Sequence, residues 1–137
     1  MATSFERTFP ATNEVLPEIL GWVEETSGSL LPLEKALNLQ LAVEEAVVNI
    51  ISYAYKESQV EPFVIIKFMD DDTALTLVIE DGGKCFNQLQ FISYDFDADV
   101  ETRQIGGLGR TFIISFTDKQ AYEYTQGHNV LTLVINK

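Results

Sequence analysis

The sequence has few of the residues that build disulfides, zinc sites and thiol nucleophiles. One cysteine, Cys85, and one histidine, His128, occur among its 137 residues. A single cysteine cannot form an internal disulfide, which is typical of a reducing compartment. A structural zinc site needs about four ligands, usually Cys and His, so none is expected. Because His128 is far from Cys85 in the sequence, we also do not expect a histidine-activated thiol.

Basic residues and long apolar runs are scarce too. Nine Lys and Arg residues stand against 21 Asp and Glu, which gives a net charge of −12. This charge repels phosphate backbones and anionic lipids, so we expect no nucleic acid and no membrane as partner, and a basic protein surface instead. No segment has the apolar length of a membrane span, and the first ten residues lack a signal pattern. The expected location is therefore cytoplasmic.

The residues that are present predict one α+β domain over residues 1–137. Apolar residues at helical spacing predict helices over 12–28 and from Pro32 to about Lys56. The β-rich runs lie at 5–9, 63–69, 74–80, 120–125 and 130–135, and a further apolar helix is expected at 111–116. The predicted fold is a two-layer sandwich with helices on one face of a mostly antiparallel sheet. His128 is expected in a hairpin turn at Gly127, with a solvated side chain.

The second predicted helix contains the stretch "VEEAVVNIISYAY", in which Glu45 and Asn49 lie one turn apart among apolar residues. At helical spacing Glu45, Asn49, Ser52 and Lys56 share one line. One interpretation is a solvent-facing stripe on a mostly buried helix. The other is a carboxylate and a carboxamide aimed into a cleft, where one accepts a proton and the other binds a hard metal ion.

Two glycine-bearing loops follow in the second half of the chain. The loop "EDGGKCFN" ends the run at 74–80, so that Asp81 can present its carboxylate to a ligand while Gly83 allows close backbone approach. An ordinary strand-ending turn is the alternative. The loop "IGGLGR" precedes the apolar segment 111–116, where free N–H groups attract anions. It matches neither the P-loop pattern nor GxGxxG.

The order of these motifs resembles the histidine-kinase-like ATPase superfamily, and most of all its small RsbW/SpoIIAB-type anti-sigma factors. The likeness covers essentially the whole chain, from the N-terminal strand through "EEAVVNIISYAY", "DGGKCFN" and "IGGLGR" to "HNVLTLVINK". It implies the Bergerat-type ATP-binding fold, with ATP or ADP and Mg²⁺ as ligands. Glu45 would be the catalytic base, and Asn49 would bind Mg²⁺. The remaining residues implied to bind the nucleotide are Asp81 (adenine amino group), Gly83 (beneath the base), Phe86, Arg103, Gly107, Leu108, Gly109 and Arg110.

The resemblance also implies a function in partner switching. The chain would bind a sigma factor or similar effector in one state, and in the other phosphorylate a serine or threonine of a STAS-type antagonist. A nucleotide-binding switch module without catalysis is the alternative, and homodimerisation is left open. The sequence departs from the family at Cys85 and Arg110, and the expected ATP lid at 88–105 carries four acidic residues opposed by Arg103. These departures bear on phosphate turnover more than on binding.

Overall fold

The computed structural model of the chain describes residues 3–90 and 112–137. The elements follow in the order β1 (Thr3–Pro10), α1 (Leu16–Gly28), α2 (Leu33–Asn49), a π-helical turn (Ile50–Ala54), β2 (Phe63–Asp70), β3 (Ala74–Asp81), β4 (Lys119–Thr125) and β5 (His128–Asn136). Within these ranges, no helix has both the length and the apolar character that a bilayer crossing would require.

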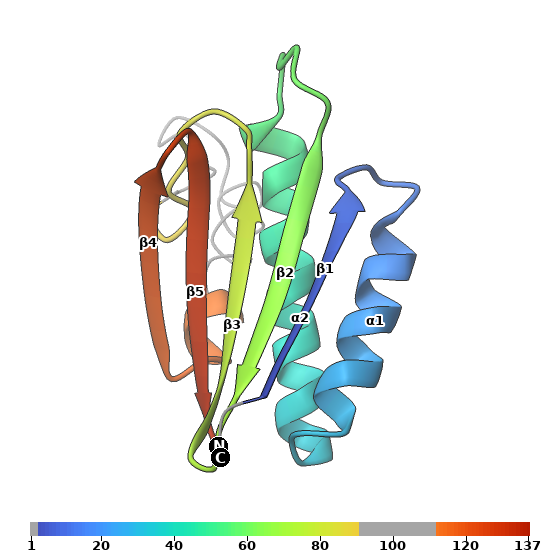
Figure 1. Cartoon of the computed structure of the whole chain (residues 1–137), viewed down its shortest axis with the longest axis vertical. Coiled ribbons are helices and arrows are strands. Elements are labelled where there is room, and N and C mark those ends of the chain that lie inside the picture. The colour runs from blue at the N-terminus through green and yellow to red at the C-terminus, as the bar shows by residue number, and fades with distance from the viewer. Residues whose placement is uncertain (1–2, 91–111) are drawn as a thin grey trace, which may run out of the picture.

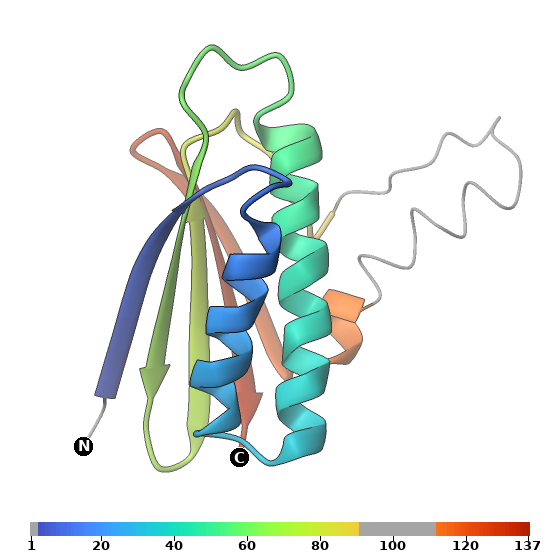
Figure 2. The same ribbon diagram turned by 90° about the vertical axis from the view of Figure 1, so that its right-hand side faces the viewer.

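The strands form one antiparallel sheet in the order β1-β2-β3-β5-β4. Both main helices lie on one face of this sheet, as Figures 1 and 2 show, and a short helix at 112–115 lies on the same face beside α2. Consecutive strands pair wherever they are joined by a short turn, while β3 pairs with β5 across a longer connection. The predicted fold, a helix layer on one face of an antiparallel sheet, is confirmed.

The core lies between the sheet and the two helices. Alternate residues of β2, β3 and β5 point toward the helices, and these inward side chains are almost fully buried. The largest fully buried side chains of the sheet are Phe9, Phe68, Ile66, Leu75, Leu77, Ile79 and Leu133. Leu39 of α2 and Ile50 of the π-turn fill the same layer. Each such side chain contributes about 1.5–3 kcal/mol through burial, which fixes α2 firmly against the sheet.

The predicted helix to Lys56 is wrong in its last turns, because the α-helix ends at Asn49 and continues as a π-turn. The N–H of Tyr55 donates to the carbonyl of Ile50 at 3.2 Å, a bond that spans five residues. The Tyr55 hydroxyl, directly after the wider turn, donates to the carbonyl of Phe63 and accepts from its N–H. The first helix likewise begins at Leu16, not at residue 12.

The hairpin between β4 and β5 is shorter than predicted. Its two turn residues, Gln126 and Gly127, have φ angles of 54° and 79°, as a tight primed turn requires. His128 is therefore the first residue of β5, and its Nδ1 lies 2.5 Å from Oε2 of Glu80 on β3. The prediction that His128 lies in the turn is wrong, because the turn ends one residue before it, and its side chain is 36% exposed and pairs with Glu80.

Candidate functional site

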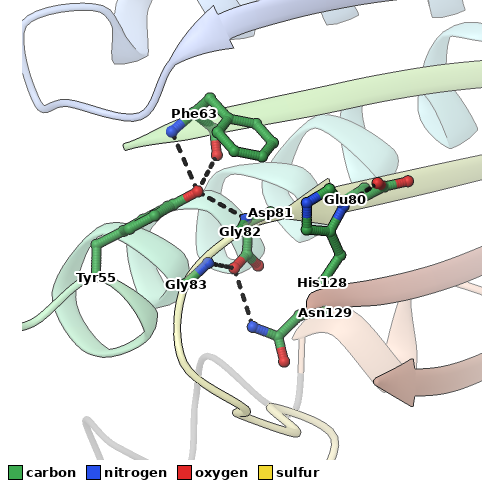
Figure 3. Close-up of polar contacts among 8 residues, drawn as sticks. All are labelled: Tyr55, Phe63, Glu80, Asp81, Gly82, Gly83, His128 and Asn129. Atoms are coloured by element: carbon green, nitrogen blue, oxygen red, sulfur yellow. Dashed lines mark hydrogen bonds and ion pairs between the residues drawn. The ribbon is translucent and has the colours of Figure 1, made fainter. Parts of the chain in front are cut away.

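Four segments meet at one end of the sheet, the upper end in Figure 1. β3 ends there at Asp81, the loop that begins at Gly82 follows, α2 ends in its π-turn, and β5 begins at His128. Figure 3 shows the polar side chains that these segments bring together. The predicted residues Asp81 and Gly83 lie in this cluster, although it draws on parts of the chain far apart in sequence.

Asp81 is the buried carboxylate of the site, with 2% of its surface exposed. Its Oδ1 accepts hydrogen bonds from the N–H of Gly83 and from Nδ2 of Asn129, both at 2.9 Å (Figure 3). No described residue donates to Oδ2. Burial raises the pKa of Asp81, and the two hydrogen bonds partly oppose this rise. The carboxylate is thus held in one orientation, with an oxygen left for the donor group of a ligand.

Asn129 holds this carboxylate and the loop together, and sequence reasoning missed it. Its Nδ2 also donates to the carbonyl of Lys84 at 2.8 Å. Its Oδ1 accepts from the N–H of Phe86 at 2.8 Å and from the hydroxyl of Tyr122 at 2.5 Å. Asn129 lies directly opposite Asp81 in the β3–β5 register, which no local pattern reveals.

Gly83 packs against the end of the π-turn. A Cβ at Gly83 would lie 2.5 Å from the carbonyl oxygen of Ala54, closer than real Cβ atoms come to backbone. The next residue, Lys84, donates its N–H to the same carbonyl at 2.9 Å. The Tyr55 hydroxyl accepts from the N–H of Gly82 at 2.8 Å and donates to the carbonyl of Phe63 at 2.6 Å. The glycine loop is therefore fixed on the helix end by backbone contacts.

Glu45 and Asn49 both lie half-buried on α2. Nδ2 of Asn49 donates to Oε1 of Gln88 at 3.2 Å, and Nε2 of Gln88 donates to the carbonyl of Ala46 at 3.4 Å. This leaves Oδ1 of Asn49 without a partner among the described residues, so it is available to a cation. Burial, and next the nearby carboxylate of Glu44, raise the pKa of Glu45, which makes it a better proton acceptor near neutral pH.

The predicted polar line along the helix is interrupted by the π-turn. Ser52 and Lys56 are exposed, whereas Glu45 and Asn49 are half-buried. The π-turn instead places the Tyr53 ring 5.6 Å from the ring of Phe86, which is partly buried. Such turns are frequent at functional sites, because they turn side chains away from the helical course.

Cys85 departs from the family pattern, and it is exposed. Its Sγ lies 3.6 Å from the hydroxyl of Tyr122, the same hydroxyl that donates to Asn129. Burial and the neighbouring thiol raise the pKa of Tyr122 to about 12, so this hydroxyl keeps its proton. The thiol therefore sits at the outer end of the hydrogen-bonded chain that reaches Asp81.

The predicted phosphate-binding half of the site lies outside the described residues. Five of the implied ligand residues belong to it, Arg103, Gly107, Leu108, Gly109 and Arg110. Most of the expected lid, with its four acidic residues, also lies outside the described residues. The described part is therefore the adenine-side and helix-side half.

A buried carboxylate at a strand end, a glycine loop clamped beneath it, and a carboxylate–carboxamide pair on the facing helix suit an adenine base and a metal-bound phosphate chain. This cluster at the end of an antiparallel sheet, with helices on one face of that sheet, is the arrangement expected of a nucleotide-binding ATPase domain. Residues 9–135 match the histidine kinase-like ATPase domain, and the chain belongs to this family. The resemblance inferred from the motifs is confirmed.

Two proteins similar to this chain are both named serine-protein kinase RsbW. The protein from Listeria monocytogenes is 28% identical over 105 residues, which cover 73% of the chain and 66% of that protein. The protein from Staphylococcus aureus is 32% identical over 84 residues, which cover 58% of the chain and 53% of that protein. The match thus spans less than two thirds of the length of either relative.

Proposed function

We propose that the chain is an ATP-binding anti-sigma regulatory protein with protein-serine/threonine kinase activity, acting as one domain in the cytoplasm. It would hold a sigma factor or similar effector and phosphorylate a STAS-type antagonist of that binding. Membership in an ATPase domain family and similarity to two proteins named serine-protein kinase support this proposal.

The fixed orientation of Asp81 is the observation that carries the nucleotide assignment. A carboxylate oxygen accepts a hydrogen bond from the adenine amino group but not from the guanine carbonyl at the corresponding position. Because Asn129 and Gly83 both donate to Oδ1, the carboxylate is oriented before ligand arrives. Preorganisation of this kind favours ATP over GTP without any change in the loop.

Phosphotransfer would use the half-buried pair on α2. The carboxylate of Glu45 would take the proton of the acceptor hydroxyl while the hydroxyl oxygen bonds to the γ-phosphorus. The bond between the γ-phosphorus and the bridging oxygen would break, and ADP would leave. Oδ1 of Asn49 would bind Mg²⁺, which neutralises phosphate charge when present and which prefers few protein oxygens. The resemblance assigns the phosphates to the backbone of Gly107 and Gly109. Arg103 and Leu108 are further predicted nucleotide contacts, and Arg110, a departure from the family, would add a phosphate contact or lie on the surface.

The experiment combines binding and transfer. Calorimetry with Mg-ATP and Mg-GTP should show a clear preference for ATP, and labelled Mg-ATP in a lysate of the source cell should label one small protein. Glu45→Ala should abolish labelling and keep ATP affinity, whereas Glu34→Ala, an exposed glutamate of the same helix, should change neither. Equal affinity for both nucleotides would overturn the adenine assignment. Partner release by ATP without any labelling would favour the non-catalytic switch module.

A further inference from the structure

A groove runs along the two main helices on the side that faces away from the sheet. α1 and α2 lie side by side in Figure 2, and the hollow between them encloses about 470 Å³. A second hollow of about 400 Å³ continues along α2, and the two share Leu37 and Gln40. The groove begins at the far end of α2 from Asn49 and lies outside the candidate nucleotide site.

Three leucines of α2 line this groove and remain exposed. Leu33, Leu37 and Leu41 are 76%, 49% and 44% exposed, and their spacing of four residues places them on one side of the helix. The opposite side of α2 already supplies the core, where Leu39 and Val43 are fully buried. The leucines therefore form a second apolar side of α2 that the fold itself does not use.

Gly21 lines the same groove in the middle of α1. A glycine inside a helix destabilises it relative to alanine, so such a residue usually has a packing reason. Here a Cβ would meet no atom within 4 Å, and the residue does not have the positive φ that favours glycine. Nothing in the described part of the chain therefore requires a glycine at position 21. Its missing side chain leaves the groove floor open to close approach by another chain.

The charge around the groove is of one sign. Glu24 and Glu25 line the first hollow and Glu44 lines the second, while no Lys or Arg among residues 3–90 and 112–137 lines either hollow. Two copies of this acidic groove would repel each other, and the net charge of −12 adds to that repulsion. The surface fits a partner that brings apolar side chains flanked by positive charge.

We propose that this groove binds a basic amphipathic α-helix of a partner protein. The leucines would receive the apolar side of that helix, the glutamates its Lys or Arg side chains, and Gly21 would let its backbone approach. Apolar anchors in a hollow with a charged rim are the usual composition of a helix-binding groove. The inference requires neither nucleotide nor Glu45, so it stands or falls apart from the kinase proposal.

The test uses a fluorescein-labelled synthetic helix of 17 residues, the length of α2, with leucines along one side and lysines beside them. Fluorescence anisotropy at physiological salt should show binding to the full chain. Leu37→Ser should weaken it at least about tenfold, the effect of losing one central anchor. Val60→Ser, which changes another exposed apolar residue (54% exposed), should leave binding unchanged. Gly21→Ala should raise the melting temperature yet weaken binding.

Controls on the probe separate a groove from general attraction between opposite charges. A scrambled peptide of the same composition lacks the apolar side and should bind at least about tenfold more weakly. Equal binding of both peptides, equal binding by Leu37→Ser and wild-type protein, or no binding at all would each overturn the proposal. So would Gly21→Ala protein that is more stable and binds as well as wild type, because the open floor would then serve no partner.

Discussion

The two ends of the helix layer differ in which kind of side chain is buried and which is exposed. At the nucleotide end, polar atoms are buried and satisfied, since Asn129 alone makes four hydrogen bonds around Asp81. At the α1–α2 groove, apolar side chains such as Leu33 are exposed to water. The described polar network is held together by contacts within the chain, whereas covering the exposed leucines with another molecule would remove apolar surface from water. The candidate nucleotide site and the proposed helix-binding groove thus lie at different positions along α2.

Two glycines show the same contrast at the level of single atoms. Gly83 has no space for a Cβ because the Ala54 carbonyl stands 2.5 Å away, whereas Gly21 has open space. The first glycine is required by the packing of the chain, whereas the proposed role of the second is toward a partner. The predictions below test this contrast, beginning with the largest expected effect.

Replacing Asn129 by alanine should have the largest effect. The change removes the acceptor of the Phe86 N–H and the donor to the Lys84 carbonyl, two part-buried hydrogen bonds, and takes one donor from the buried Asp81. We expect the free energy of unfolding to fall by about 3 kcal/mol, measured by urea denaturation. The exposed Asn13→Ala is the control, with a change within about 0.5 kcal/mol. A loss no larger than the control's would mean that the network does not fix this end of the sheet.

The glycine pair gives the second prediction, in which one substitution has opposite signs. Gly83→Ala forces a methyl group onto backbone and should lower the free energy of unfolding by about 2 kcal/mol. Gly21→Ala should raise it by about 1 kcal/mol, because alanine favours the helix and meets no atom. Thermal and urea denaturation of both variants measure this. Effects of the same sign would remove the contrast between the two regions.

Asp81→Asn should separate binding from stability. ATP binding should weaken by about 1–3 kcal/mol, because an amide N–H would then face the adenine amino group. Stability at neutral pH should not fall, since the amide oxygen can still accept from Gly83 and Asn129. The pKa of Asp81 is raised in the fold, so ionised Asp81 lowers the stability of the wild-type protein. This cost is absent at low pH and grows as the pH rises to the folded-state pKa. Asp81→Asn should therefore be more stable relative to wild type at neutral pH than in acid. Calorimetry and urea denaturation at two pH values measure both effects.

The smallest expected effect concerns Glu44. Its carboxylate is the second cause of the raised pKa of Glu45, after burial. Glu44→Gln should therefore lower the pKa of Glu45 without restoring the value of an exposed glutamate. NMR titration of the side-chain carboxyl measures this, with Glu34→Gln on the same helix as the control. A pKa of Glu45 that stays unchanged in Glu44→Gln would leave burial as the only cause.

The amino-acid sequence determined what depends on neighbours along the chain. The periodicities placed β1, β2, β3 and the two helices within a few residues, and the order of the Glu45, Asp81 and glycine-loop motifs indicated the family. These signals are local, because helix and strand patterns repeat every two to four residues.

Only the tertiary structure decided which distant residues meet. Asn129 reaches Asp81 because β5 pairs with β3 in one register, although 48 residues separate the two. The residue after the π-turn, Tyr55, bonds through its hydroxyl to β2 and to the glycine loop, and the groove lies where α1 packs beside α2. Such contacts depend on strand order and helix packing, which are set by burial summed over the whole core and which no local stretch of sequence encodes.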